Sequence, residues 1–231
     1  LAASATIANA REHAEALRGL PVEGLKARVA RTGRELLVHL PKPLDRRGER
    51  RRSPLLEAAY LARRLAEAGL KGLVFAGARK SAELIARYAA HPLVRPYRAG
   101  YTARERRRLE ADLKEGRVRV LVSTSALELG VDIGELDAVV LVGYPGSTAA
   151  FWQRAGRAGR GERRALLVYI PREDPMDEYF LHRPALLLES PPEEAVADPQ
   201  NPVLCPLHLH AAARETPLLA EAPLCPEARA T

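Results

Sequence analysis

The sequence is poor in cysteine and has no long apolar run. Its two cysteines, Cys205 and Cys225, are too few for a disulfide framework and suit a reducing compartment. No apolar stretch approaches the length of a membrane span, and no signal-peptide pattern opens the chain. These absences argue against a secreted or membrane-inserted protein, so we expect a cytoplasmic protein with no membrane partner.

Lysine is scarce as well, because 31 of the 36 basic residues are arginine. Arginine forms forked, bidentate contacts to phosphate, whereas lysine offers a point charge. The codon usage of a GC-rich genome explains the excess equally well. The formal net charge of +7 still favours nucleic acid over acidic proteins as a partner. With 47% apolar residues among 231, the chain can bury one core with attached pieces.

Six short apolar runs, separated mostly by helical patterns, are typical of a parallel α/β sheet. Ligands bind such a sheet at the carboxyl ends of its strands. The polar turns Ser123-Thr124 and Gly143–Gly146 follow two of these runs and are therefore expected to face the same crevice. The predicted strands are Glu35–Leu40, Gly72–Ala76, Val94–Arg98, Val118–Val122, Ala138–Val142 and Ala165–Ile170.

A basic block, Q-R-A-G-R-A-G-R, runs from Gln153 to Arg160. On a helix, the spacing of Arg157 and Arg160 puts two guanidinium groups on one face. The two glycines of the block, Gly156 and Gly159, allow other backbone to come close. Paired arginines directed at one point suit a polyanion, most obviously the γ-phosphate of a nucleotide.

Together with L-G-V-D-I upstream, this block resembles motifs V and VI of superfamily 2 (DExH/DEAD-type) helicases, which lie in the second of two RecA-like domains. Ser4-Ala5-Thr6 resembles motif III, and Leu73–Phe75 followed by Arg79 resembles motif IV. The runs A-L-E-L-G-V-D-I-G-E-L-D-A-V and G-Y-P-G are most similar to the YprA/MrfA-type group of RecQ-related DNA repair helicases. The resemblance extends over residues 1–170 and is thin beyond them.

The resemblance implies an α/β fold of the RecA-like, P-loop NTPase type, with a parallel sheet flanked by helices and a mainly helical or irregular C-terminal extension. Residues 1–33 would be a remnant of the first RecA-like domain with a linker. Residues 34–172 would form the second RecA-like domain. Residues 173–231 would form the extension, because 11 of the 18 prolines lie beyond residue 170.

The resemblance also assigns residues to a nucleotide site. ATP and Mg²⁺ would be bound mainly by the upstream RecA-like domain, and Arg157 and Arg160 would act as catalytic arginines, with Arg160 as the arginine finger. Gly130, Asp132 and Gln153 would lie on the nucleotide side. A structural role, in which the arginines pair with Glu128 or Asp132 to hold the loop, is the alternative. No metal-binding residue is expected in this domain.

The track for nucleic acid would consist of Arg79, Gly100, Ser123 and Thr124, with DNA preferred over RNA. The alternative for Arg79 is an ordinary surface arginine. Ser4 and Thr6 would couple the nucleotide state to domain movement, although an exposed helical remnant is the simpler interpretation of that segment. Two rival functions stay open: an RNA helicase domain, and a non-catalytic nucleic-acid-binding module.

The chain lacks the G-x-x-x-x-G-K-[ST] loop and the acidic strand that such a motor requires. Gly72–Gly77 is a near miss without the lysine, and no apolar strand leads into Asp177-Glu178. We therefore expect a piece of a longer helicase that does not hydrolyse ATP alone.

Several local patterns predict helices and their ends. Ser53 and Pro54 suit the start of one helix, with the serine hydroxyl as cap. Thr102 and Glu105 form a capping box at the start of another. The helix after Arg79 is predicted to face inward with Leu84, Ile85, Tyr88 and Ala89.

The C-terminal extension contains residue types that bind zinc. Their spacing fits no standard zinc pattern, and a core cysteine with surface histidines is the preferred interpretation. The residues concerned are Cys205, His208, His210 and Cys225.

Overall fold

The computed structural model describes residues 7–25, 33–47, 50–127, 133–159, 164–198 and 201–217. These residues fall into two compact units, one within residues 29–191 and the other combining residues from 1–28 and 192–231. Within the described residues, no helix has the length and apolar character needed to cross a membrane.

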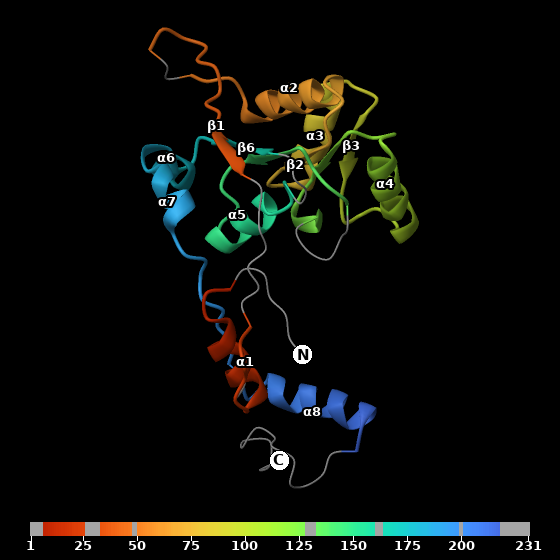
Figure 1. Ribbon diagram of the computed structural model, residues 1–231, viewed down its shortest axis with the longest axis vertical. Helices are drawn as coiled ribbons and strands as arrows, with labels where there is room; N and C mark the ends of the chain where they lie inside the picture. The colour runs from red at the N-terminus through yellow and green to blue at the C-terminus, as the bar shows by residue number, and fades with distance from the viewer. Residues whose placement is uncertain are drawn as a thin grey trace. The chain divides into compact units, whose positions relative to one another are not determined.

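The larger unit is built on one parallel sheet of six strands in the order β1-β6-β5-β2-β4-β3 (Figure 1). All five pairings are parallel. All six strands expected from the sequence are present, so the predicted α/β fold with a parallel sheet is confirmed. The strands are β1 (Arg34–Val38), β2 (Gly72–Phe75), β3 (Val94–Tyr97), β4 (Val120–Ser123), β5 (Ala138–Val142) and β6 (Ala165–Ile170).

Helices cover both faces of this sheet, which is why its central strands are apolar throughout. Between the strands lie α2 (Pro54–Glu67), α3 (Arg79–Ala89), α4 (Ala103–Glu115), the short 3₁₀ helix η1 (Ser125–Leu127) and α5 (Thr148–Ala155). After β6 come α6 (Pro175–His182) and α7 (Pro184–Glu189).

The two faces of the sheet carry side chains of different size. On the face under α2 and α3, valines of the strands meet small residues of the helices, such as Ala62 and Ala82. On the opposite face, larger side chains such as Phe75 and Tyr169 pack with Phe151 of α5 and Phe180 of α6. Alternation along each strand sends successive side chains to opposite faces and so separates the two sets.

Two local predictions on this helical layer are wrong. Tyr88 does not face inward but is 49% exposed, because the inward face of α3 centres on Ala82, Ile85 and Ala89. Ser53 makes no side-chain cap to α2, although Pro54 stands in the first turn as predicted. The capping box of α4 is confirmed: Glu105 N–H donates to the Thr102 hydroxyl, and Thr102 N–H donates to the Glu105 carboxylate.

The smaller unit contains α1 (Ala10–Arg18) and α8 (Leu204–Glu215), and neither helix has a buried residue. The side chain of Asn9 joins its two segments, because its amide donates to Ala195 O at 3.1 Å and its carbonyl accepts from Ala195 N–H at 2.9 Å. Cys205 is half-buried, not a core residue. The described residues contain no group of three metal-binding side chains, and Cys225 lies outside them.

Candidate functional site

Four loops leave the sheet side by side at the carboxyl ends of β3, β4, β2 and β5, which we call the carboxyl edge. The pairing register sets Tyr97 and Phe75 on either side of Ser123, and Leu141 beside Phe75. The loops that follow therefore begin at the same level. Adjacent strands lie about 4.8 Å apart, so the four ends extend over roughly 14 Å.

The loop after β2 leads directly into α3, and Arg79 is the first helical residue, as predicted. Its side chain is exposed. Ala76 N–H donates to Ser123 O at 2.7 Å, which joins this loop to the end of β4. Arg79 thus stands at the carboxyl edge beside the Ser123-Thr124 turn.

Ser123 and Thr124 differ in accessibility. The side chain of Ser123 is fully buried, and its Oγ has no hydrogen-bond partner among the described residues. Thr124 is half-buried. A ligand at the carboxyl edge therefore meets Thr124, with Ser123 beneath it.

The turn after β3 is exposed at Gly100. Tyr101 N–H closes the turn on Arg98 O at 3.2 Å. The Arg98 guanidinium lies 5.1 Å from the centre of the Tyr101 ring and also pairs with Glu83 at 2.9 Å. One face of this ring is therefore already occupied by a cation.

The loop after β5 packs against α6. Gly143 has a φ of +80°, and a Cβ there would stand 2.1 Å from Nε of Arg172, whose side chain lies across this position. Tyr144 N–H donates to Asp177 Oδ1 at 2.6 Å, and the rings of Tyr144 and Phe180 are 4.4 Å apart. Glycine is therefore required at position 143 both for its backbone angle and for space.

Asp177 is a fully buried carboxylate. Besides Tyr144 N–H, it accepts the Tyr169 hydroxyl and, at 3.3 Å, Nε of Arg172. Burial raises the pKa of Asp177. Burial, followed by the bond to this carboxylate, also raises the pKa of Tyr169. The sequence gave no sign of this network beyond the near-miss acidic pair Asp177-Glu178.

The segment with the paired arginines follows α5. Ser147 caps this helix by accepting Ala150 N–H at 3.0 Å. Gln153 is half-buried and Arg157 is only 7% exposed. An arginine this deeply enclosed does not extend from the surface as a finger would.

The backbone of the same segment is fixed from β1 and from the start of β5. Arg34 donates from Nε to Ala158 O at 2.9 Å and from Nη2 to Gly156 O at 3.5 Å. Gly159 N–H donates to Leu136 O at 3.2 Å. Arg34 is a supporting residue that no local pattern in the sequence indicated, because it acts across 122 and 124 positions of the chain.

Five of the predicted site residues lie outside the described residues: Ser4, Thr6, Gly130, Asp132 and Arg160. The others surround the carboxyl edge or the end of α5, as described above.

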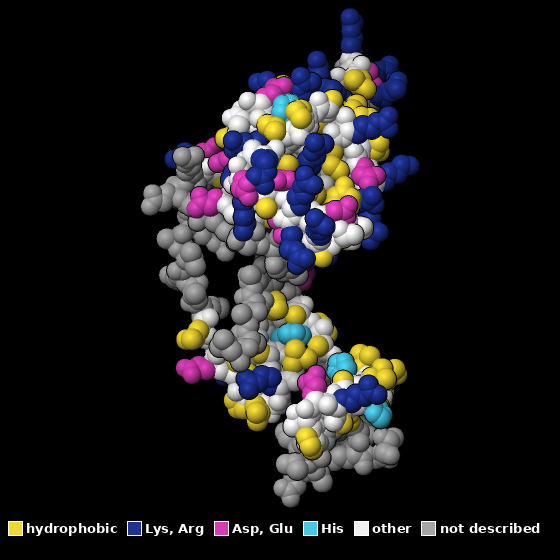
Figure 2. Space-filling view, turned by 90° about the vertical axis from the view of Figure 1, so that its right-hand side faces the viewer, with side chains coloured by type: hydrophobic (Ala, Val, Ile, Leu, Met, Phe, Trp, Pro, Cys, Tyr) yellow, Lys and Arg dark blue, Asp and Glu magenta, His cyan; other side chains and the backbone are white. Residues whose placement is uncertain are grey.

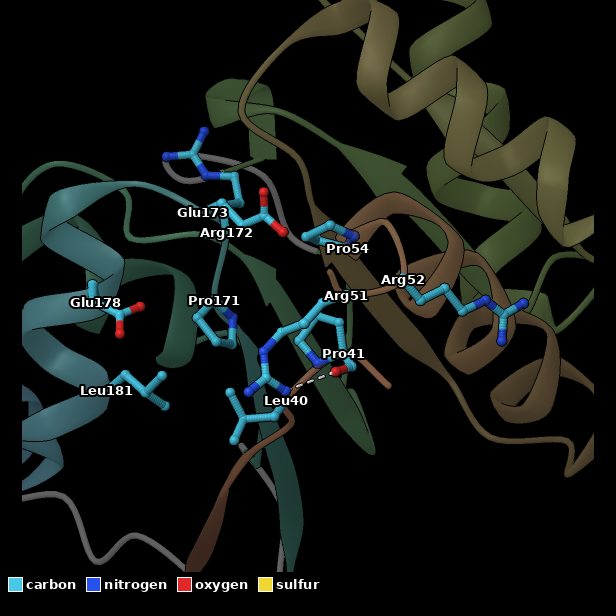
Figure 3. Close-up of a pocket in the computed structure, with 10 residues that line it drawn as sticks. All are labelled: Leu40, Pro41, Arg51, Arg52, Pro54, Pro171, Arg172, Glu173, Glu178 and Leu181. Carbon is cyan, nitrogen blue, oxygen red and sulfur yellow. Dashed lines mark hydrogen bonds between the residues drawn. The ribbon is translucent and has the colours of Figure 1, made fainter. Parts of the chain in front are cut away.

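A cavity of about 260 Å³ lies nearby, at the carboxyl ends of β1 and β6 (Figure 3). Its arginines already have partners: Arg51 donates to Pro41 O at 3.2 Å, Arg52 lies 3.6 Å from Glu57, and Arg172 lies 2.8 Å from Asp174. None of the predicted site residues that the structure describes lines this cavity.

A parallel sheet with these loops at one edge is the architecture of the second RecA-like domain of superfamily 2 helicases. Residues 55–162 match the helicase conserved C-terminal domain. The chain therefore carries the C-terminal domain of this helicase family.

Within that family, the chain is 37% identical over 227 residues to the uncharacterized ATP-dependent helicase YprA of Bacillus subtilis. The matched region covers 94% of this chain and 30% of YprA. It is also 37% identical over 179 residues to the ATP-dependent helicase hrq1 of Schizosaccharomyces pombe, covering 73% of this chain and 17% of the relative. The DUF1998 helicase MrfA bound to DNA and AMPPNP superimposes with a TM-score of 0.83 at 36% identity, over 96% of this chain and 32% of MrfA. The chain thus spans about a third or less of these relatives.

Proposed function

We propose that this chain is the C-terminal motor domain of an ATP-dependent DNA helicase or translocase. The observation that carries the proposal is the carboxyl edge of a helicase C-terminal domain, where Arg79, Gly100 and Thr124 follow three adjacent strands in register. The same proposal divides the chain into three parts. Residues 1–33 belong to the first RecA-like domain and a linker, residues 34–172 form the second RecA-like domain, and residues 173–231 form an extension.

The carboxyl edge would carry one strand of nucleic acid. The exposed Arg79 guanidinium and the Thr124 hydroxyl would bind phosphate oxygens, and Gly100 would let backbone approach closely. Ser123 is buried, so we assign it the support of Thr124 from beneath. MrfA is described as bound to DNA, which favours DNA. A role in repair rests on resemblance to the YprA/MrfA-type group.

ATP with Mg²⁺ would occupy the cleft between this domain and an upstream RecA-like domain, which would supply the phosphate-binding loop and the metal site. Gln153, Gly130 and Asp132 would line this domain's side of the cleft. The fixed backbone from Gly156 to Gly159 suits a preorganised cationic segment. We assign Arg160 as the arginine finger and the enclosed Arg157 as its neighbour and support.

In the intact protein, closure of the two domains around nucleotide would bring Arg160 to the γ-phosphate, where its charge would stabilise the transferring group. Reopening after hydrolysis would shift the grip on the strand. Ser4 and Thr6 would link these two events. Alone, the chain lacks the phosphate-binding loop and would not hydrolyse ATP.

The test is Arg160→Ala in the full-length protein that contains this chain. Hydrolysis stimulated by single-stranded DNA should fall by about 10³–10⁵, while DNA affinity stays within about twofold. Arg164→Ala is the matched control, because Arg164 is 82% exposed and pairs with Glu35 on the surface. Parental hydrolysis by the Arg160 variant would refute the finger. Stronger stimulation by RNA than by DNA would replace the DNA helicase with an RNA helicase.

A further inference from the structure

The outward face of α4 carries three arginines, of which only Arg108 has an acidic partner on the helix, Asp112 at 3.9 Å. Arg104, Arg107 and Arg108 are exposed. Arg107 and Arg108 lie three and four positions after Arg104, which places each of them on the same side of the helix as Arg104. Like charges at this spacing destabilise a helix. The face lies on the side of the larger unit that Figure 2 turns toward the reader, where basic side chains outnumber acidic ones.

Each acidic residue of α4 is engaged elsewhere. Glu105 closes the capping box with the Thr102 backbone and hydroxyl, both at 2.8 Å. Glu110 accepts the Tyr97 hydroxyl at 2.7 Å and so turns toward the sheet. Asp112 accepts from Arg117 at 2.6 Å, and Glu115 also pairs with Arg117.

The outward arginines are left with little neutralisation. Within the described part of the chain, no hydrogen bond or ion pair engages Arg104 or Arg107. Arg108 has only a 3.9 Å approach to Asp112 and is 84% exposed.

Helix α2 carries exposed arginines that, unlike Arg104 and Arg107, are paired within their own helix. Arg63 and Arg64 both pair with Glu67 of the same helix, at 2.7 and 2.8 Å. Two exposed arginines on one helix can therefore be neutralised locally in this protein. The face of α4 keeps repelling charges with one weak local contact, between Arg108 and Asp112, which suits a surface completed by an external polyanion.

The position of α4 indicates which polyanion. The helix begins at Ala103, after its capping residue Thr102 and close to the exposed turn at Gly100. It therefore runs from the carboxyl edge along the flank of the domain beside β3 (Figure 1). Arg104 and Arg108 are about 6 Å apart along its axis. A rigid row of cations gains most from phosphates at fixed, dense spacing, and duplex DNA carries one charge per about 1.7 Å of axis, twice the density of one strand.

We propose that the α4 face, consisting of Arg104, Arg107 and Arg108, binds the phosphate backbone of the duplex that flanks the single strand on the carboxyl edge. This rests on the proposed function, because it takes the strand's path past Gly100 as given. It adds a second, sequence-independent contact outside the motor cleft. Fork-shaped or tailed DNA would therefore bind more tightly than a single strand of equal length.

The test uses the full-length protein with Arg104→Gln/Arg107→Gln, and Arg63→Gln/Arg64→Gln as control, since both remove two positive charges. Affinity is measured between 50 and 200 mM salt for a tailed duplex and for its single-stranded tail alone. For the tailed duplex, the α4 variant should lower the magnitude of the slope of log affinity against log salt by about two. At 50 mM salt its affinity should be at least about tenfold weaker, with the tail alone within about twofold.

Three results would overturn the proposal: an unchanged slope for the tailed duplex, an equal loss on the tail alone, or an equal loss in the α2 control. Hydrolysis at saturating single-stranded DNA should match the parent in both variants. If the parent protein neither binds single-stranded DNA nor hydrolyses ATP in its presence, the proposed function fails. That outcome is seen in the parent alone, whereas loss of the α4 contact is seen only as a difference in salt slope between the parent and the α4 variant.

Discussion

At the scale of single residues, the positions of the β5–α5 loop and of the arginine segment depend on side chains that are distant from them in the sequence. Asp177 accepts from Tyr144 of the β5–α5 loop, 33 positions away, and Arg34 fixes the carbonyls of Gly156 and Ala158. Neither residue is among those proposed to contact nucleotide or nucleic acid. Their effect is to restrict where the loop and the arginine segment lie.

Replacing Asp177 should destabilise the larger unit. Asp177→Ala removes the acceptor of the buried Tyr169 hydroxyl and of the half-buried Tyr144 N–H, so we expect a loss of roughly 3 kcal/mol in the free energy of unfolding. Asp177→Asn keeps one acceptor oxygen and should lose about half as much. Urea unfolding measures both. Glu178→Ala on the same helix is the control, because Glu178 is 60% exposed and should change stability by less than about 0.5 kcal/mol. Equal effects of the Asp177 and Glu178 variants would contradict the network.

At the scale of elements, two helices begin after a residue that can cap them, but only one of these residues forms the cap. Both Ser53 and Thr102 precede helices and belong to residue types that favour the capping position. Only Thr102 accepts a hydrogen bond from its helix. The same sequence signal therefore has different energetic weight at α2 and α4.

This difference can be measured directly. Thr102→Ala should lower the free energy of unfolding by about 1 kcal/mol, because Glu105 N–H loses its partner. Ser53→Ala should change it by a few tenths of a kcal/mol. Chemical denaturation of the two single variants provides the comparison, and a larger loss for Ser53→Ala would show that the cap assignments are reversed.

At the scale of the whole molecule, burial is confined to the larger unit. All described buried hydrophobic residues lie between Ala58 and Leu187, and α1 and α8 have none. Among the described residues, the core is therefore formed without the segments of the smaller unit.

A chain reduced to residues 33–191 should accordingly fold alone. Its thermal unfolding midpoint should stay within about 3 °C of that of the 231-residue chain, because less than about 1 kcal/mol is removed. Circular dichroism and calorimetry test this. A midpoint lower by more than about 10 °C, or loss of the sheet signal, would mean that the smaller unit contributes to the core.

The sequence alone determined the six strands, their parallel sheet and the helicase family, because strand runs, turn residues and motif order are local signals. It also placed Arg79 at the start of a helix and Thr102 in a capping box, since both depend on neighbours within four positions. Local periodicity was less reliable for Tyr88, which sits at the margin of the buried face of α3.

Only the tertiary structure decided which candidate side chains are accessible. The hydroxyl of Ser123 and the side chain of Arg157 are enclosed, and burial depends on layers contributed by distant elements. The roles of Arg34 and Asp177 could not be predicted from the sequence for the same reason, because the order of the strands brings their partners near. Among the residues that the structure describes, it also left Arg104 and Arg107 without an ion-pair partner, because Glu105 and Glu110 turn to the helix cap and to Tyr97.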